Sequence, residues 1–159
     1  MARKTGYSGA TLTVKLTESL TIDGRDYGGS SSSTFSSIKN VTRRIETITT
    51  TEATIITFST VIGAGQYIAA NIAYMRFTNL DDTNFIVLTF ANENDDELAV
   101  KVDAGQTFAL YGDNTGGMAD MIDAIAGSGL TYSLGDMKSI TADADTASCD
   151  MEIYIAEIA

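Results

Sequence analysis

The stretch Ser139-Ile140-Thr141-Ala142-Asp143-Ala144 alternates polar and aliphatic side chains, and residues 11–17, TLTVKLT, do the same near the other end of the chain. A period of two residues places alternate side chains on opposite faces and is typical of a half-buried β-strand. Such runs recur about every ten residues, which is the spacing of β-sandwiches and barrels and not of parallel βαβ units. We therefore expect an all-β fold, an antiparallel jelly-roll-like β-sandwich.

Strand patterns cover most of the chain. In the two Thr-rich strands 41–50 and 53–60, joined by a tight turn near Thr51-Glu52, we expect Val41, Ile45, Ile55 and Phe58 to face the core. Residues 10–22 are expected to form one long strand or two joined strands. The other expected strands are 35–38, 73–80, 84–91, 97–102, a return strand through Phe108, Leu110 and Tyr111, 137–144 and 148–158.

A Gly/Ser-rich segment, residues 23–33, interrupts these strands. It begins with the turn signal Asp23-Gly24, and Gly and Ser favour turns. A loop at the tip of a sheet serves either as a mobile linker or as a contact surface, here around Tyr27. We expect a loop over the whole segment.

Two segments carry more apolar surface than one small sandwich readily hides. Residues 84–91, NFIVLTFA, are apolar on both faces and predict a central strand that a second sheet or a neighbouring subunit covers on both sides. Residues 118–126 predict one short helix, because Met118, Met121, Ile122 and Ile125 fall at i, i+3, i+4 and i+7. These segments predict self-association, and a homotrimer is the state we expect.

The length of 159 residues fits one domain with a core of its own. We expect a single sandwich domain over residues 10–159, preceded by a flexible N-terminal arm over residues 1–9. The beginning of the chain does not resemble a signal peptide, and no stretch approaches the ~20 apolar residues needed to cross a bilayer.

The chain contains no His, no Pro, no Trp and a single Cys. Without His it lacks the usual proton shuttle near neutral pH, the commonest metal ligand and most constellations of nucleophilic catalysis. The phosphate-binding and nucleophile-elbow motifs are also missing. We therefore expect a structural or binding protein, with no enzymatic activity, no cofactor and no metal.

The net charge of −11 opposes binding to nucleic acid and to anionic membranes, because both carry phosphates. The basic pairs Arg3-Lys4 and Arg43-Arg44 are too small to form a phosphate-binding stripe. We expect neither partner, and an acidic outer surface.

Acidic residues gather at Asp81-Asp82, at residues 93–97, and at Asp143, Asp145 and Asp150. These positions fall near the ends of the expected strands, and none continues into the calcium loop of an EF-hand. We interpret them as solvated turns. Cys149 has no neighbouring positive charge to activate a thiolate, so we expect a small core residue.

Residues 74–85 (YMRFTNLDDTNF), 101–110 (KVDAGQTFAL) and 139–152 (SITADADTASCDME) together resemble segments of small β-structured virion proteins of tailed bacteriophages. The resemblance covers about residues 74–158. Its motifs specify turns and strands and transfer no catalytic residue. It implies a capsid decoration, or cement, protein or a component of the tail or fibre.

We expect a decoration protein that is made in the host cytoplasm, lies on the capsid surface of the virion, and binds and stabilises the lattice of the major capsid protein. A compact domain without fibre repeats and an acidic outside favour this role. A tail or fibre adaptor remains an alternative, as does a carbohydrate-binding module or depolymerase, although a sugar site would favour exposed aromatics and Trp is absent. The candidate interface residues are Arg3, Lys4, Tyr7, Tyr27, Met118, Met121, Ile122 and Ile125.

Overall fold

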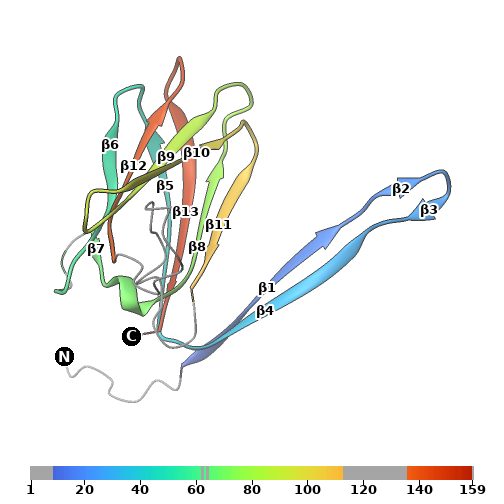
Figure 1. The fold of residues 1–159 in the computed structure, drawn as a ribbon, viewed down its shortest axis with the longest axis horizontal. Helices are drawn as coiled ribbons and strands as arrows, with labels where there is room; N and C mark the ends of the chain where they lie inside the picture. The colour runs from blue at the N-terminus through green and yellow to red at the C-terminus, as the bar shows by residue number, and fades with distance from the viewer. Residues whose placement is uncertain (1–8, 62, 64, 113–135, 159) are drawn as a thin grey trace, which may run out of the picture.

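The computed structural model describes residues 9–61, 63, 65–112 and 136–158, and most of them form β-strands. Two facing sheets make a sandwich, and a long two-stranded hairpin extends away from it (Figure 1). One sheet has the strand order β11-β8-β13-β5, and the other has the order β10-β9-β12-β6-β7. The expected all-β sandwich is confirmed.

We call residues 10–38 the hairpin and the sandwich after it, residues 40–158, the body. The hairpin contains β1 (Ala10–Glu18), β2 (Thr21–Ile22), β3 (Arg25–Asp26) and β4 (Gly29–Ile38). A single turn of 3-10 helix, η1 (Ala69–Asn71), precedes β8. The strands of the body are β5 (Asn40–Ile48), β6 (Ala53–Phe58), β7 (Gln66–Tyr67), β8 (Ile72–Asn79), β9 (Ile86–Asn92), β10 (Glu97–Val102), β11 (Thr107–Tyr111), β12 (Met137–Ala144) and β13 (Cys149–Glu157).

The long strands of the body pair in a nested order. The first, β5, pairs antiparallel with the last, β13, and within that pair β6 pairs with β12, β8 with β11, and β9 with β10. The body is therefore one long antiparallel ribbon of paired strands that folds over into two sheets. Further pairing of β8 with β13 and of β9 with β12 completes these sheets. This is the double Greek key of a jelly roll, as expected.

The core lies between the two sheets and follows the two-residue alternation of the central strands. Phe77 of β8 and Phe90 of β9 meet there edge to face, with ring centroids 6.1 Å apart. Cys149 is buried in the same core, as expected. The largest fully buried side chains are Ile56, Ile72, Met75, Phe77, Ile86, Leu88, Phe90, Ile140, Met151, Ile153 and Ile155.

The apolar segment 84–91 forms most of β9, which lies between β10 and β12. Ile86, Leu88 and Phe90 are fully buried, whereas the alternate residues on the outer face are only half-buried. On that face Val87 lies between Lys101 of β10 and Asp143 of β12. The second sheet therefore covers only one face of this strand, and the other face is partly polar.

Of the four residues of β5 and β6 that were predicted to face the core, two do so. Ile55 is buried and Phe58 packs against the core, but Val41 and Ile45 are exposed on the outer face. Buried Ile48 sets the alternation of β5, so the even-numbered side chains point inward. Polar Arg44 is tolerated inward because the strand lies at the edge, where its guanidinium donates to the Ile55 carbonyl and to the Tyr67 hydroxyl.

The predicted loop over residues 23–33 is wrong for most of its length. Residues 29–33 belong to β4 and pair with β1, so that Ser31 lies opposite Leu16 and Ser33 opposite Val14. Pairing with a partner distant in sequence outweighs the weak strand preference of Ser and Gly. The expected joined strands in 10–22 are present as β1 and β2, and 35–38 is the end of β4.

The helix predicted over residues 118–126 lies outside the described residues, as do residues 1–8 of the predicted flexible arm. In the described part of the chain, no helix combines the length and the apolar character that crossing a membrane requires.

Candidate interaction surface

The base of the hairpin is anchored on the outer face of the β11-β8-β13-β5 sheet. Buried Phe35 packs in one cluster with Leu12 and Val14 of the hairpin and with Tyr74 and Tyr154 of the sheet. The ring of Phe35 lies 6.0 Å from Tyr74 and 6.1 Å from the ring of Tyr111. Such aromatic pairs stabilise beyond the area that they bury, so this end of the hairpin is fixed to the body.

A bulge marks the point where the hairpin leaves the sheet. The pairing of β1 with β4 slips by one residue between Ala10 and Leu12, and Ser37 in the bulge has a positive φ of 63°. Bulges bend and twist a strand locally. A Cβ at Gly9 would lie 2.3 Å from Ser37 Cα, so the close approach of these two backbone segments requires glycine at position 9. Lys39 alone separates β4 from β5, and the hairpin is thus a bent continuation of the body.

The tip of the hairpin is closed by Asp23 and Gly24. Both have positive φ, 49° and 77°, and the flanking Ile22 and Arg25 pair directly. This is a two-residue type I′ turn, for which Asp-Gly is a preferred sequence because both central residues must adopt positive φ. The expected turn at Asp23-Gly24 is confirmed.

The outer half of the hairpin exposes large apolar side chains. Leu16 is 55% exposed, Leu20 50%, Ile22 51% and Tyr27 59%. A two-stranded hairpin is marginal by itself in water, and exposed apolar groups gathered on a projecting element mark an interaction site. The outer half of the hairpin is therefore a candidate contact surface.

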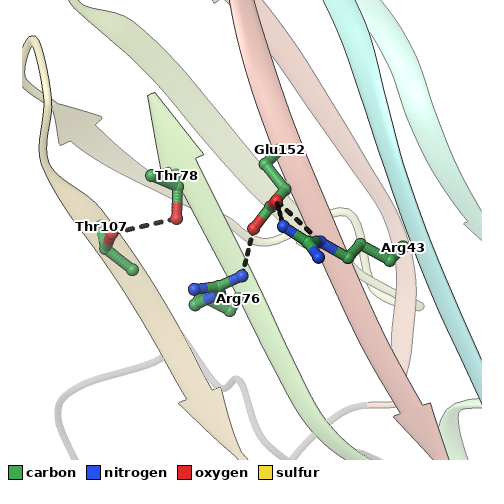
Figure 2. A network of polar contacts seen from close by, with 5 residues as sticks. All are labelled: Arg43, Arg76, Thr78, Thr107 and Glu152. Carbon is green, nitrogen blue, oxygen red and sulfur yellow. Dashed lines mark hydrogen bonds and ion pairs between the residues drawn. The ribbon is translucent and has the colours of Figure 1, made fainter. Parts of the chain in front are cut away.

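A network of ion pairs lies on the same outer face of the body, beyond the base of the hairpin. Figure 2 shows Glu152 of β13 between Arg43 of β5 and Arg76 of β8, with the Thr78 and Thr107 hydroxyls 3.0 Å apart beside it. Arg43 donates from Nε and Nη2 to one Glu152 oxygen, at 2.8 and 2.6 Å, and Arg76 donates to the other. The Arg76 guanidinium also lies 5.6 Å from the ring centroid of Tyr154.

Exposure within this network is uneven. The Glu152 side chain is 11% exposed, whereas Arg43 is 69% exposed and lies between Val41 and Ile45 along the outer side of β5. Val41 and Ile45 are themselves 47% and 63% exposed. These three residues with Arg76 and Glu152 form what we call the β5 patch. It presents two aliphatic groups beside two cations that share one carboxylate.

A second buried carboxylate, Glu157, faces the other side of β13. Its Oε2 accepts a hydrogen bond of 2.7 Å from the Asn40 amide. Burial raises the pKa of Glu157, and the hydrogen bond from Asn40 opposes this only in part. Asn40 and the end of β13 thus hold a carboxyl whose charged form is costly.

The acidic clusters are placed in turns or at strand ends. Asp81 Oδ1 accepts hydrogen bonds from the backbone N–H groups of Asn84, at 2.6 Å, and of Thr83, at 2.8 Å. These hydrogen bonds lower the pKa of Asp81. Asp145 lies in the turn after β12, as expected, but Asp143 and Asp150 lie within β12 and β13, so the prediction of turns is wrong for these two residues. Among the described residues, no three acidic or cysteine side chains come close enough together to hold a metal ion.

Of the predicted interface residues, Tyr27 lies on the exposed half of the hairpin. The other predicted interface residues, Arg3, Lys4, Tyr7, Met118, Met121, Ile122 and Ile125, lie outside the described residues. Sequence reasoning missed Leu16, Leu20, Ile22 and the β5 patch. The Asp-Gly turn between Ile22 and Arg25 was the available signal for a hairpin, but the Ser run after it concealed the second strand.

Comparison with known proteins does not assign the chain to a family. No family model matches the chain, and no curated protein matches it significantly. A solved chain from the study "Bacillus endospore appendages form a novel family of disulfide-linked pili" is 10% identical, with a TM-score of 0.40 over 99% of this chain and 97% of that one. At this identity and TM-score the likeness assigns no role to the chain.

Proposed function

We propose that this chain is a non-enzymatic structural protein of a phage virion, a decoration protein that binds the major capsid protein lattice and stabilises it. The observation that carries the proposal is the hairpin, which is anchored at its base and exposes Leu16, Leu20, Ile22 and Tyr27 along its outer half. A rigid body with one projecting apolar element suits a subunit that is held within a larger assembly.

The remaining support is consistent with this role and less specific. Jelly rolls occur in viral capsid proteins, in lectins and in cupins, so the fold permits the role without selecting it. The charge of −11 favours a surface away from packaged DNA. The resemblance of residues 74–158 to small virion proteins of tailed phages points the same way. Self-association, as a trimer, belongs to the same proposal.

The test uses phage particles that lack this protein. Purified full-length chain is added back, and occupancy and the temperature of capsid disruption are measured together. Because a ligand that binds only the intact lattice stabilises it by mass action, the disruption temperature should rise with occupancy.

A matched variant tests whether the outer half of the hairpin is required for occupancy. Replacing residues 16–31 by Asn-Gly shortens the hairpin but keeps Leu12, Val14 and Phe35 at its base. This variant should fold and fail to occupy the particle. If the full-length chain binds only the tail, it is an adaptor; if it binds no part of the particle, the proposed function is wrong.

A further inference from the structure

We propose that the outer half of the hairpin docks on the β5 patch of a second copy of this chain. The inference deepens the proposed function, on which it rests for the setting, by naming the partner of the hairpin. It starts from two surfaces of one chain that are exposed, apolar and opposite in charge.

The apolar parts of the two surfaces match in kind. The hairpin presents Leu20 and Ile22, each about half exposed, and the β5 patch presents Val41 and Ile45. Aliphatic groups of this size gain free energy when they leave water together, roughly in proportion to the area removed. Neither surface has a cover within the described part of its own chain.

Charge selects this pairing over other exposed places on the body. The ion pairs Arg44–Glu46, Lys101–Asp103 and Lys138–Asp95 are one to one, whereas Glu152 serves both Arg43 and Arg76. The β5 patch thus has a surplus of positive charge on a chain whose net charge is −11. Asp150, the other carboxylate that β13 places on this face, lies opposite Thr47 beside Ile45 and accepts a hydrogen bond from the Thr47 hydroxyl, so the surplus of positive charge lies around Arg43 and Arg76.

The hairpin supplies the complementary charge. Residues 16–31 contain the carboxylates Glu18, Asp23 and Asp26 and the single cation Arg25, a net charge of −2. Two copies with this overall charge repel at a distance, so a stable contact requires local opposite charges of this kind.

Geometry makes the partner a second molecule. The hairpin base lies over β11, β8 and β13, whereas the outer half of the hairpin and its tip point away from the body in Figure 1. Only the base of the hairpin adjoins the β5 patch of its own chain, where Leu12 and Val14 lie near Arg76, and the outer half does not reach it. Such a contact is either exchanged reciprocally in a two-fold dimer or, when it is heterologous, closes into a ring or continues as a chain of subunits.

The experiment uses the purified full-length protein without particles. Ile22→Cys and Ile45→Cys are prepared as separate single variants that differ in mass by a tag, and they are mixed and mildly oxidised. Buried Cys149 remains in both, and the wild-type chain controls for it. We expect Ile22–Ile45 cross-linked heterodimers well above the share that random collision gives. Ile22→Cys mixed with Leu98→Cys is the matched control, because Leu98 is also an exposed aliphatic residue, 49% exposed against 63% for Ile45, and lies on the other sheet.

Sedimentation equilibrium provides an independent readout that needs no new cysteine. The double variant Leu20→Ser/Ile22→Ser changes only exposed side chains and should weaken self-association at least tenfold, with an unchanged far-ultraviolet spectrum. Heterodimers no more frequent than in the Leu98→Cys control, or wild-type affinity in the double variant, would overturn the inference. In either of those cases, particle binding that still requires the hairpin would leave the proposed function standing, with the capsid lattice as the hairpin's partner.

Discussion

The body and the hairpin of this chain have opposite arrangements of apolar side chains. In the body, Phe77, Phe90 and Ile153 are fully enclosed between two sheets that belong to the same molecule. In the hairpin, only the base is covered, and Leu20 and Ile22 remain half exposed. The body therefore has a core of its own, and under the proposed function the outer half of the hairpin gains its main stabilisation from assembly.

The largest expected effect comes from the core. Phe77→Ala should lower the free energy of unfolding by about 3–5 kcal/mol, because it removes a buried ring between the sheets and leaves a cavity. Urea denaturation of the dilute subunit measures this. Leu20→Ala is the control from the hairpin and should cost less than about 0.5 kcal/mol under the same conditions. Equal losses for the two variants would remove the distinction between body and hairpin.

The next effect concerns the β5 patch. Glu152→Gln keeps the shape of the side chain but removes the charge that Arg43 and Arg76 share, which should cost about 1–3 kcal/mol. Glu46→Gln is the matched control, since within the described part of the chain Glu46 forms one ion pair, with Arg44, and is more exposed, and a loss of about 0.5 kcal/mol is expected there. If Glu46→Gln lowers the free energy of unfolding as much as Glu152→Gln does, the carboxylate that Arg43 and Arg76 share stabilises the fold no more than a simple exposed ion pair.

Phe35 tests the joint between the two regions. Phe35→Ala removes the ring that packs on Tyr74 and Tyr111, so the hairpin should loosen as a unit. Hydrogen exchange of residues 10–38 should accelerate, while exchange in β8 and β13 is retained. Faster exchange throughout the body would show that hairpin and body unfold together.

The strands of the body were largely predictable because their local pattern and their final environment agree. Each sheet of the sandwich has one face toward the core and one toward the outside. This arrangement produces the alternation of buried and outward side chains in residues 73–80 and 137–144, and the connection after Ile86–Asn92 is polar because it lies outside the core. The nested pairing needs contacts between residues far apart in sequence, which no local pattern specifies. Its prediction as a jelly roll therefore rested on strand spacing and on resemblance.

Two of the errors have separate physical causes. Ser30 to Ser33 have no strand preference of their own and become a strand by pairing with Thr17 to Val14. Val41 and Ile45 are aliphatic, and a rule that places aliphatic groups inside assigns them inward. The alternation fixed by Ile48 places them outward instead, which is why the β5 patch could not be found from sequence alone.

The smallest expected effect is a pH dependence within the body. Burial raises the pKa of Glu157 above its ordinary value of 4.5, so between the two values the folded state binds this proton more strongly than the unfolded state. The contribution of Glu157 to stability is thus full below 4.5 and declines as pH rises through the folded pKa. Glu157→Gln should remove this decline and be slightly more stable than wild type at neutral pH. Parallel stability curves for both proteins from pH 4 to 7 would contradict the assignment.

The most direct test of the central claim compares hydrogen exchange of the dilute subunit with that of the protein assembled on particles. We predict rapid exchange of residues 16–31 in the dilute subunit, strong protection of the same residues after assembly, and little change in β8 and β13. Unchanged rapid exchange of residues 16–31 in the assembled state, with new protection confined to the body, would contradict the account.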